Sequence, residues 1–305
     1  MSIDAKTVKE LRDRTGAGMM DCKRALSETD GDLDAAVALL REKGLASAAK
    51  KAGRVAAEGL VGVFASADGS EAVVVELNCE TDFVAKNDAF GDLLETIGNA
   101  LLDSDADEGT GESAGDLTVG SKKLSEVLTD AVASIGENIG LRRFMRVRAG
   151  GGRVGSYVHA GGKIGVLVEL SGASEAHDDL ARSLAMQVAA AMPRHVRRDE
   201  VPEAEVAAER EIFKNQALAS GKPEQVVEKI VDGKVDKFFR EICLVEQEYV
   251  RDSQLTVEKL LAQSGKETGS ELRLERFVRY QLGEGIEKKE SNLAAEVAEQ
   301  LGKST

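Results

Sequence analysis

Apolar residues in the first 45 positions recur at helical spacing in three short runs. The runs comprise Ile3, Val8 and Leu11, then Met19, Cys22 and Leu26, then Leu33, Ala36, Val37 and Leu40. Glycines at 16, 18 and 31 separate them, and Asp32 is a good N-cap for the third, which we expect to end at Gly44. The pattern predicts a compact three-helix unit, followed over 46–58 by an Ala-rich basic linker.

The segments Gly59 to Leu77 and Gly152 to Leu170 form an internal repeat that aligns without gaps. Glycines, valines and a closing Glu-Leu coincide in the two copies. Each copy alternates like two strands around a turn, at Asp68-Gly69 in the first and Gly161-Gly162 in the second. We therefore predict two related β-hairpins.

An amphipathic helix is expected after each hairpin. Its apolar stripe is Phe90, Leu94 and Ile97 in the first copy and Leu180, Leu184 and Val188 in the second. The first copy has about three extra residues at the junction, within the stretch from Asn78 to Phe83, whereas the second passes through Ser171 to Ser174. An addition at one strand-to-helix junction is where a binding site is readily placed.

The remaining segments alternate between polar and helical patterns. The acidic stretch 103–120 has almost no apolar residues, so we expect a mobile loop. A helix over 124–139 and a strand over 143–148 should follow. After Pro202, two apolar-striped segments around the Ser220-to-Pro223 turn predict a protruding antiparallel helical hairpin resembling a coiled coil.

The chain should close with a strand near 272–280 and a helix carrying Leu293, Val297 and Leu301, capped by Ser291 or Asn292. The two β-hairpin-helix units predict the α+β class, with a core of two related subdomains. The expected parts are a three-helix domain, two core subdomains, the helical hairpin, and the rest of the core with a C-terminal strand-helix module. Their bounds are 1–54, 55–140, 141–200, 201–255 and 256–305.

Composition narrows the class of protein. Of 305 residues 42% are hydrophobic, but only 4% are aromatic and Trp is absent, so aliphatic side chains must build the cores. A formal net charge of −14 disfavours a nucleic-acid binder, because such proteins neutralise phosphates with Lys and Arg. No apolar run is long enough to span a membrane, and no leader is visible. Three widely spaced cysteines fit free thiols in a reducing, cytoplasmic setting.

Motifs that would carry catalysis are missing from the sequence. The three histidines, His159, His177 and His195, lack metal-ligand spacing. No P-loop or nucleophile elbow is present, and Gly16-Ala17-Gly18 follows a helix rather than a strand, against a dinucleotide site. We therefore predict no metal, no cofactor and no enzymatic activity, and a protein that acts by binding.

Two N-terminal motifs resemble the elongation factor Ts family. One runs from Val8 to Lys23 and the other from Thr81 to Asp88. Three further segments are similar in family order, Ile135 to Ile139, Gly155 to His159 and Val278 to Lys288. The resemblance thus spans nearly the whole chain.

The resemblance implies a ubiquitin-associated-like (UBA-like) N-terminal domain and a guanine nucleotide exchange factor for the GTPase elongation factor Tu. In such a factor the ring of Phe83, beside Asp82, would wedge into the nucleotide domain, disturb the Mg²⁺ site and loosen GDP. Thr81 and Val84 would complete this contact. Further partner contacts carried over by the resemblance are Met19, Met20, Lys23, Ile135, Gly136, His159 and Val250. A 2:2 assembly with the partner is compatible with the resemblance.

Other interpretations remain open at this stage. Phe83 shares a helical face with Phe90, Leu94 and Ile97, so periodicity favours a core position. Met19 would equally close a three-helix core, and His159 beside a glycine turn is typical of a plain surface residue. The alternative function is a UBA-like adaptor or co-chaperone without exchange activity. Such an adaptor would not need the extended junction that carries Phe83.

Overall fold

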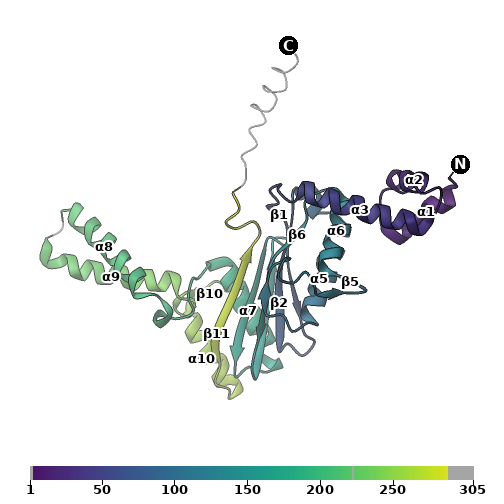
Figure 1. Ribbon diagram of the computed structural model, residues 1–305. Helices are drawn as coiled ribbons and strands as arrows, with labels where there is room; N and C mark the ends of the chain where they lie inside the picture. Colours follow the sequence, from purple (N-terminus) through teal and green to yellow (C-terminus); the bar gives the residue numbers. More distant parts are fainter. Residues whose placement is uncertain (1–2, 222, 288–305) are drawn as a thin grey trace, which may run out of the picture.

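Three helices form the N-terminal unit of the computed structural model, which describes residues 3–221 and 223–287 (Figure 1). They are α1 (Ala5–Thr15), α2 (Met19–Glu28) and α3 (Leu33–Lys51). Asp32 caps α3 by accepting hydrogen bonds from the amides of Asp34 and Ala35. Leu11, Cys22, Leu26 and Ala36 are fully buried between the helices, so the predicted three-helix unit is confirmed.

Helix α3 does not end at Gly44, contrary to the prediction. It continues to Lys51 and packs along α6 (Leu124–Ile135). Gly44 is buried, and a Cβ there would lie 3.3 Å from Cβ of Ala133, so the glycine serves close helix packing rather than termination. The alanines after Gly44 favour helix, and the first half of the expected linker is therefore helical.

The two β-hairpins of the repeat are present and have the same register. The first joins β1 (Glu58–Ala65) to β2 (Glu71–Cys79), and the second joins β7 (Gly152–His159) to β8 (Ile164–Ser171). Gly59 opposes Asn78, and the aligned Gly152 opposes Ser171. A Cβ at either glycine would lie 2.1 or 2.2 Å from a leucine carbonyl oxygen across the pair, so no larger residue fits.

Two sheets pack face to face to form the centre of the molecule. The first has the order β1-β2-β6-β3, with β6 at Gly140–Arg148 and β3 at Glu108–Gly109. The second has the order β11-β8-β7, with β11 at Arg273–Gln281, which confirms the predicted late strand. Side chains from both sheets share one buried cluster between them, comprising Val61, Ala72, Val74, Val147, Ala149, Val154, Leu167, Val278 and Tyr280.

Helices cover the outer face of each sheet. Val73, Val75 and Leu77 of β2 point the other way from Val74 and pack with α5 (Asp88–Leu102) and α6. On the opposite side, the outward residues of β8 pack with α7 (Asp178–Ala191) and α10 (Val257–Thr268). The layers therefore run helix, sheet, sheet, helix, in agreement with the predicted α+β class. Helix α10 was not predicted.

The acidic segment 103–120 has a defined path, which corrects the expected mobile loop. Its β3 pairs with β6, and the amide of Gly111 donates to the carbonyl of Leu141 at 2.8 Å. Residues 118–119 form β4, which pairs with β5 (Lys122–Lys123), and Ala114 and Val119 are buried. These few apolar side chains and backbone bonds hold the segment although its composition is polar.

Helices α8 (Glu203–Ala219) and α9 (Glu224–Ile242) form the antiparallel hairpin, which projects from the sheets as predicted (Figure 1). Short elements connect the rest: 3-10 turns at Glu175–His177, Arg198–Glu200 and Leu244–Glu246, and strands β9 (Glu248–Tyr249) and β10 (Asp252–Thr256). The predicted last helix lies outside the described residues. The exact domain bounds stay predictions.

Candidate functional site

A separate four-residue helix carries Phe83. This helix, α4 (Asp82–Ala85), fills the extended junction of the first repeat. Thr81 caps it, with its side chain accepting a hydrogen bond from the amide of Val84. Asn87 then caps α5 through the amide of Ala89, so the chain changes direction between Phe83 and Phe90. Phe83 is 80% exposed while Phe90 is fully buried, so the core interpretation of Phe83 is wrong.

Charges flank the exposed ring. The Lys86 ammonium donates to the Asp82 carboxylate at 2.6 Å, one turn along the chain. This hydrogen bond lowers the pKa of Asp82 below its usual range, and the charge of Lys163 lowers it further. The Asp82 carboxylate is therefore ionised at neutral pH. The turn of the second hairpin lies on the same side as α4, because Lys163 pairs with Glu58 of β1, the strand against which α4 packs.

Ile135 and Gly136 lie beside α4. Helix α6 ends at Ile135, and Gly136 adopts the left-handed conformation at φ 93°, which favours glycine. The next residue, Glu137, accepts hydrogen bonds from the backbone amides of Glu80 and Thr81 at 3.0 Å each. These hydrogen bonds directly join the motif at Thr81 to Asp88 with the motif at Ile135 to Ile139.

His159 ends β7 at the same edge. The amide of Val61 in β1 donates to the carbonyl of Gly162 at 2.7 Å, and Lys163 forms an ion pair with Glu58 at 3.2 Å. His159 and its neighbour Val158 are exposed, and Nδ1 of His159 is 3.0 Å from the Tyr157 hydroxyl. Together, α4, the turn after α6 and the end of β7 form one surface, which we call the Phe83 surface.

The remaining predicted contacts are exposed but lie on other elements. Met19 and Met20 begin α2 and are 45% and 64% exposed, so neither closes the three-helix core, and Lys23 is also exposed. Val250, 50% exposed, lies in the turn between β9 and β10, where its amide donates to Oε1 of the buried Gln187 at 2.8 Å. Within residues 3–221 and 223–287, no hydrogen bond or ion pair joins these residues to the Phe83 surface.

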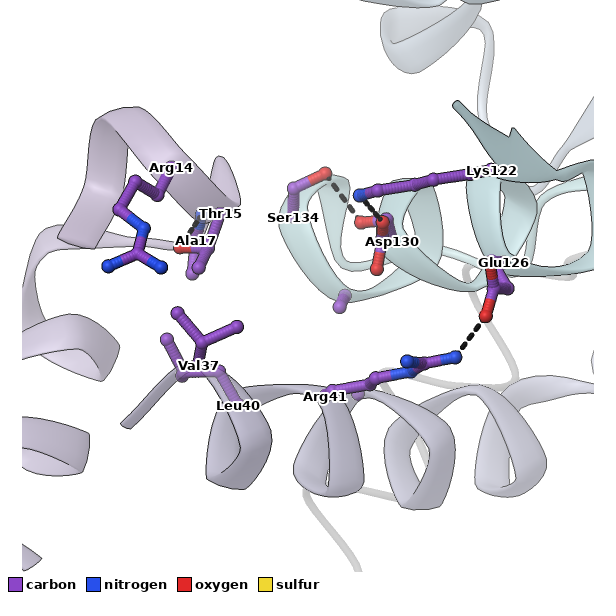
Figure 2. A pocket seen from close by; sticks show the side chains of 12 residues that line it. Arg14, Thr15, Ala17, Val37, Leu40, Arg41, Lys122, Glu126, Asp130 and Ser134 are labelled. Carbon is purple, nitrogen blue, oxygen red and sulfur yellow. Dashed lines mark hydrogen bonds and ion pairs between the residues drawn. The ribbon is translucent and has the colours of Figure 1, made fainter. Parts of the chain in front are cut away.

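A cavity of about 230 Å³ separates the three-helix unit from α6 (Figure 2). Arg41 of α3 bridges it by an ion pair with Glu126, and Lys122 pairs with Asp130 at 2.5 Å on the α6 side. Val37 and Leu40 line the opposite wall. The α2 surface is thus held to the core mainly through α3, at the Gly44 contact and the Arg41 ion pair.

A family profile described as elongation factor TS matches residues 80–284 of this chain. The chain belongs to the elongation factor Ts family. It is 50% identical to elongation factor Ts of Clostridium botulinum (strain Alaska E43 / Type E3) over 306 residues, covering 99% of this chain and 100% of that protein. The elongation factors Ts of Halothermothrix orenii and Clostridium perfringens (strain SM101 / Type A) are 49% and 48% identical over 307 residues each.

Membership of the elongation factor Ts family makes this chain a translation elongation factor, with a role in protein biosynthesis. Within residues 3–221 and 223–287, no cluster of His, Cys, Asp or Glu is placed to hold a metal ion. In the same part of the chain no helix has the length and apolar character needed to cross a bilayer.

Sequence reasoning missed two residues of the Phe83 surface. Glu137 lay within a segment that resembled the family but received no role, because one acidic residue after a glycine carries no local signal. Lys163 follows the Gly161-Gly162 turn and comes near α4 only because that turn binds β1 of the first hairpin, through the Gly162 carbonyl and the Lys163–Glu58 ion pair. Both positions depend on tertiary contacts that a linear pattern does not contain.

Proposed function

We propose that this chain binds elongation factor Tu in its GDP form and accelerates release of the nucleotide by inserting Phe83 into the GTPase. The observation that carries the proposal is the 80% exposure of Phe83 on the capped helix α4. A large aromatic ring left in water loses favourable burial energy, so its exposure on an anchored helix is typical of a contact residue.

The proposed mechanism requires no chemistry from this chain. Mg²⁺ in a GTPase bridges the phosphates and protein side chains, so displacing its ligands removes a large part of the nucleotide affinity. The ionised Asp82 next to the ring would add a negative charge close to that Mg²⁺ site. By linkage, a factor that weakens GDP binding is itself bound more weakly when GDP is present. A ternary complex therefore precedes release, and the chain acts as an exchange factor rather than an enzyme.

Burial of one Phe side chain supplies about 1.5–3 kcal/mol, which is too little to displace a tightly held nucleotide alone. The remaining predicted contacts would supply additional area. On the Phe83 surface these are Thr81, Val84, Ile135, Gly136 and His159, and elsewhere Met19, Met20, Lys23 and Val250. Exposed Met side chains adapt well to a partner surface, as α2 would require.

The experiment measures release of a fluorescent GDP analogue from elongation factor Tu after rapid mixing with the chain. The wild type should accelerate release, and Phe83→Ala should reduce that acceleration about 10- to 100-fold, the rate equivalent of the lost burial energy. Thr118→Ala, an exposed change on β4, is the control and should match the wild type. Absence of any acceleration by the wild type would refute the proposal.

Stoichiometry can be measured on the same complex. Light scattering of the purified complex separates a 1:1 from a 2:2 assembly with elongation factor Tu.

The full-length match to proteins named elongation factor Ts supports the exchange function over the adaptor alternative. We place its action in the cytoplasm, where translation proceeds.

A further inference from the structure

Helix α4 is too short to hold its own conformation. One turn of helix fixes several backbone angles for a single hydrogen bond, so a four-residue helix is unstable in isolation. The orientation of Phe83 must therefore come from the groups that fix the two ends of α4. Ala85 supplies one anchor, because it is 6% exposed and packs into the core beneath α5.

The other anchor is a pair of carboxylates, Glu137 and Glu80, each of which accepts backbone amides from the segment that carries the other. Oε2 of Glu137 accepts the amides of Glu80 and Thr81 at 3.0 Å each, and Oε1 accepts the Thr81 hydroxyl at 2.6 Å. In return, Oε1 of Glu80 accepts the amide of Asn138 at 2.7 Å. Four donors from two distant segments are thus satisfied by two ionisable side chains, and hydrogen bonds to charged acceptors are the stronger kind.

The segment that follows α3 joins the same arrangement. Arg54 lies 3.3 Å from Oε1 of Glu80, and its carbonyl accepts Nδ2 of Asn138 at 2.8 Å. Beneath the junction, the buried Cys79 thiol donates to the carbonyl of Thr81 at 3.1 Å. Thr81, which caps α4, is therefore held through its amide, hydroxyl and carbonyl groups.

The second repeat lacks this arrangement. Ala173 occupies the position aligned with Glu80, and Ser174 the position aligned with Thr81. The amide of Ser174 donates to Nδ1 of His177, only three residues away, at 3.0 Å. The distant carboxylate anchor is thus specific to the copy that carries the exposed ring, although both copies need their junction amides satisfied.

We infer that Glu137, supported by Glu80, is the positioning residue that sets the orientation of α4 and so aims Phe83 at the partner. Glu137 acts through Phe83 and need not touch the partner itself. The expected effect of Glu137 on GDP release rests on the proposed function. The orientation of α4, however, can be measured without any partner.

The partner-free test uses the absence of Trp from the chain. Phe83→Trp introduces a single tryptophan, whose fluorescence anisotropy reports the order of α4. Adding Glu137→Ala leaves two amides and a hydroxyl without their acceptor, so the anisotropy should fall. Glu137→Gln keeps one carbonyl oxygen for the amides and should retain most of the wild-type anisotropy. Glu95→Ala, which removes an exposed carboxylate on α5, is the matched control and should change nothing. Unchanged anisotropy in Glu137→Ala would overturn the inference.

The exchange test separates positioning from general loss of structure. We expect Glu137→Ala to lower the maximal GDP release rate about 10- to 100-fold, as misplacement of a contact group does, with Glu137→Gln intermediate. The concentration of chain giving half-maximal release should change much less. In a Phe83→Ala background, Glu137→Ala should lower the rate by less than about twofold further, since both changes remove one function.

Circular dichroism and thermal melting of each variant show whether it is folded. If Glu137→Ala does not fold, Glu137→Gln replaces it in the exchange test. The slowing of GDP release that Glu137→Gln causes is then measured in the wild-type chain and in the Phe83→Ala chain. Equal slowing by the Glu137 change with and without Phe83 would contradict the inference. If the wild type itself fails to accelerate release, the proposed function fails, whereas the anisotropy result still judges the positioning role.

Discussion

Cys79 lies directly beneath the helix that carries Phe83, and its environment keeps it a thiol. Burial raises the pKa of Cys79 to about 12, and the negative charge of Glu137 adds to this effect. A protonated thiol can donate its hydrogen bond to the carbonyl of Thr81, whereas a thiolate could not. The residue therefore serves the junction by staying neutral.

The pKa of Cys79 leads to a prediction about reactivity. At pH 8 the thiolate fraction should be about 10⁻⁴, so a disulfide reagent should label Cys79 in the folded chain far more slowly than in denaturant. Because the pKa is raised on folding, stability from the neutral thiol is complete below pH 9 and is lost as pH rises toward 12. Labelling followed by mass spectrometry checks this, and rapid labelling of native Cys79 at pH 8 would contradict it.

Helical periodicity fails to predict the orientation of the Phe83 side chain. The spacing of Phe83, Phe90 and Leu94 suits one continuous helix, but Asn87 caps α5 and starts a new helix direction. The cap was readable as an Asn-Asp pair before an apolar run. The bonds from Glu137 that hold the preceding turn were not readable, because they join residues far apart in the sequence.

Among the elements, α5 lies unusually close to the first hairpin at one glycine. A Cβ on Gly98 would lie 2.0 Å from the ring of Phe64 in β1, whereas a Cβ on Gly91 of the same helix would meet nothing within 4 Å. Both positions are helical, so alanine should improve the intrinsic helix propensity at each by about 0.5–1 kcal/mol. The surroundings of the two glycines therefore give alanine opposite effects on stability at the two positions.

We predict that Gly98→Ala destabilises the chain by about 1–3 kcal/mol, since the overpacking against Phe64 exceeds the gain in propensity. Gly91→Ala should instead stabilise it by about 0.5–1 kcal/mol. Urea denaturation of the two variants measures both values. Equal effects of the two substitutions would show that the ring of Phe64 moves aside at little cost.

The hairpins and the helical pair could be predicted because their signals are local. Alternation and turn glycines define each strand, and the repeat reveals the shared register before any contact is known. The continuation of α3 past Gly44 could not be predicted in the same way. A glycine followed by alanines fits either a helix end or a close contact, and only Ala133 of α6 decides between them.

The whole molecule depends on contacts that cross between its layers. Glu76 of β2 is fully buried, and Oε1 accepts Nη1 of Arg142 and the amide of Gly283, each at 2.8 Å. Its Oε2 accepts Nε of Arg143 at 2.6 Å. One carboxylate therefore joins the centre of the first sheet to the segment that leaves the last strand of the second.

Removing this carboxylate should weaken the entire fold. Glu76→Ala leaves two arginines without their partner, and we expect a loss of about 3 kcal/mol, toward the lower end of the range for broken buried pairs because both arginines are partly exposed. The matched control is Glu169→Ala at the aligned position of the second repeat. Its ion pair with the half-exposed Arg276 should contribute below about 1 kcal/mol. Chemical denaturation compares them, and similar losses would contradict the proposed bridging role.

Helix α3 gives the molecule a lever arm. The eight residues of α3 that precede Arg41, where the ion pair with α6 anchors the helix, span about 12 Å, so a 10° tilt at that anchor would move the start of the helix by about 2 Å. Met20 is carried at that end, while Phe83 stays fixed to the sheets. The close contact between Gly44 of α3 and Ala133 of α6 therefore sets the distance between Met20 and Phe83, the two separated residues proposed to contact a partner.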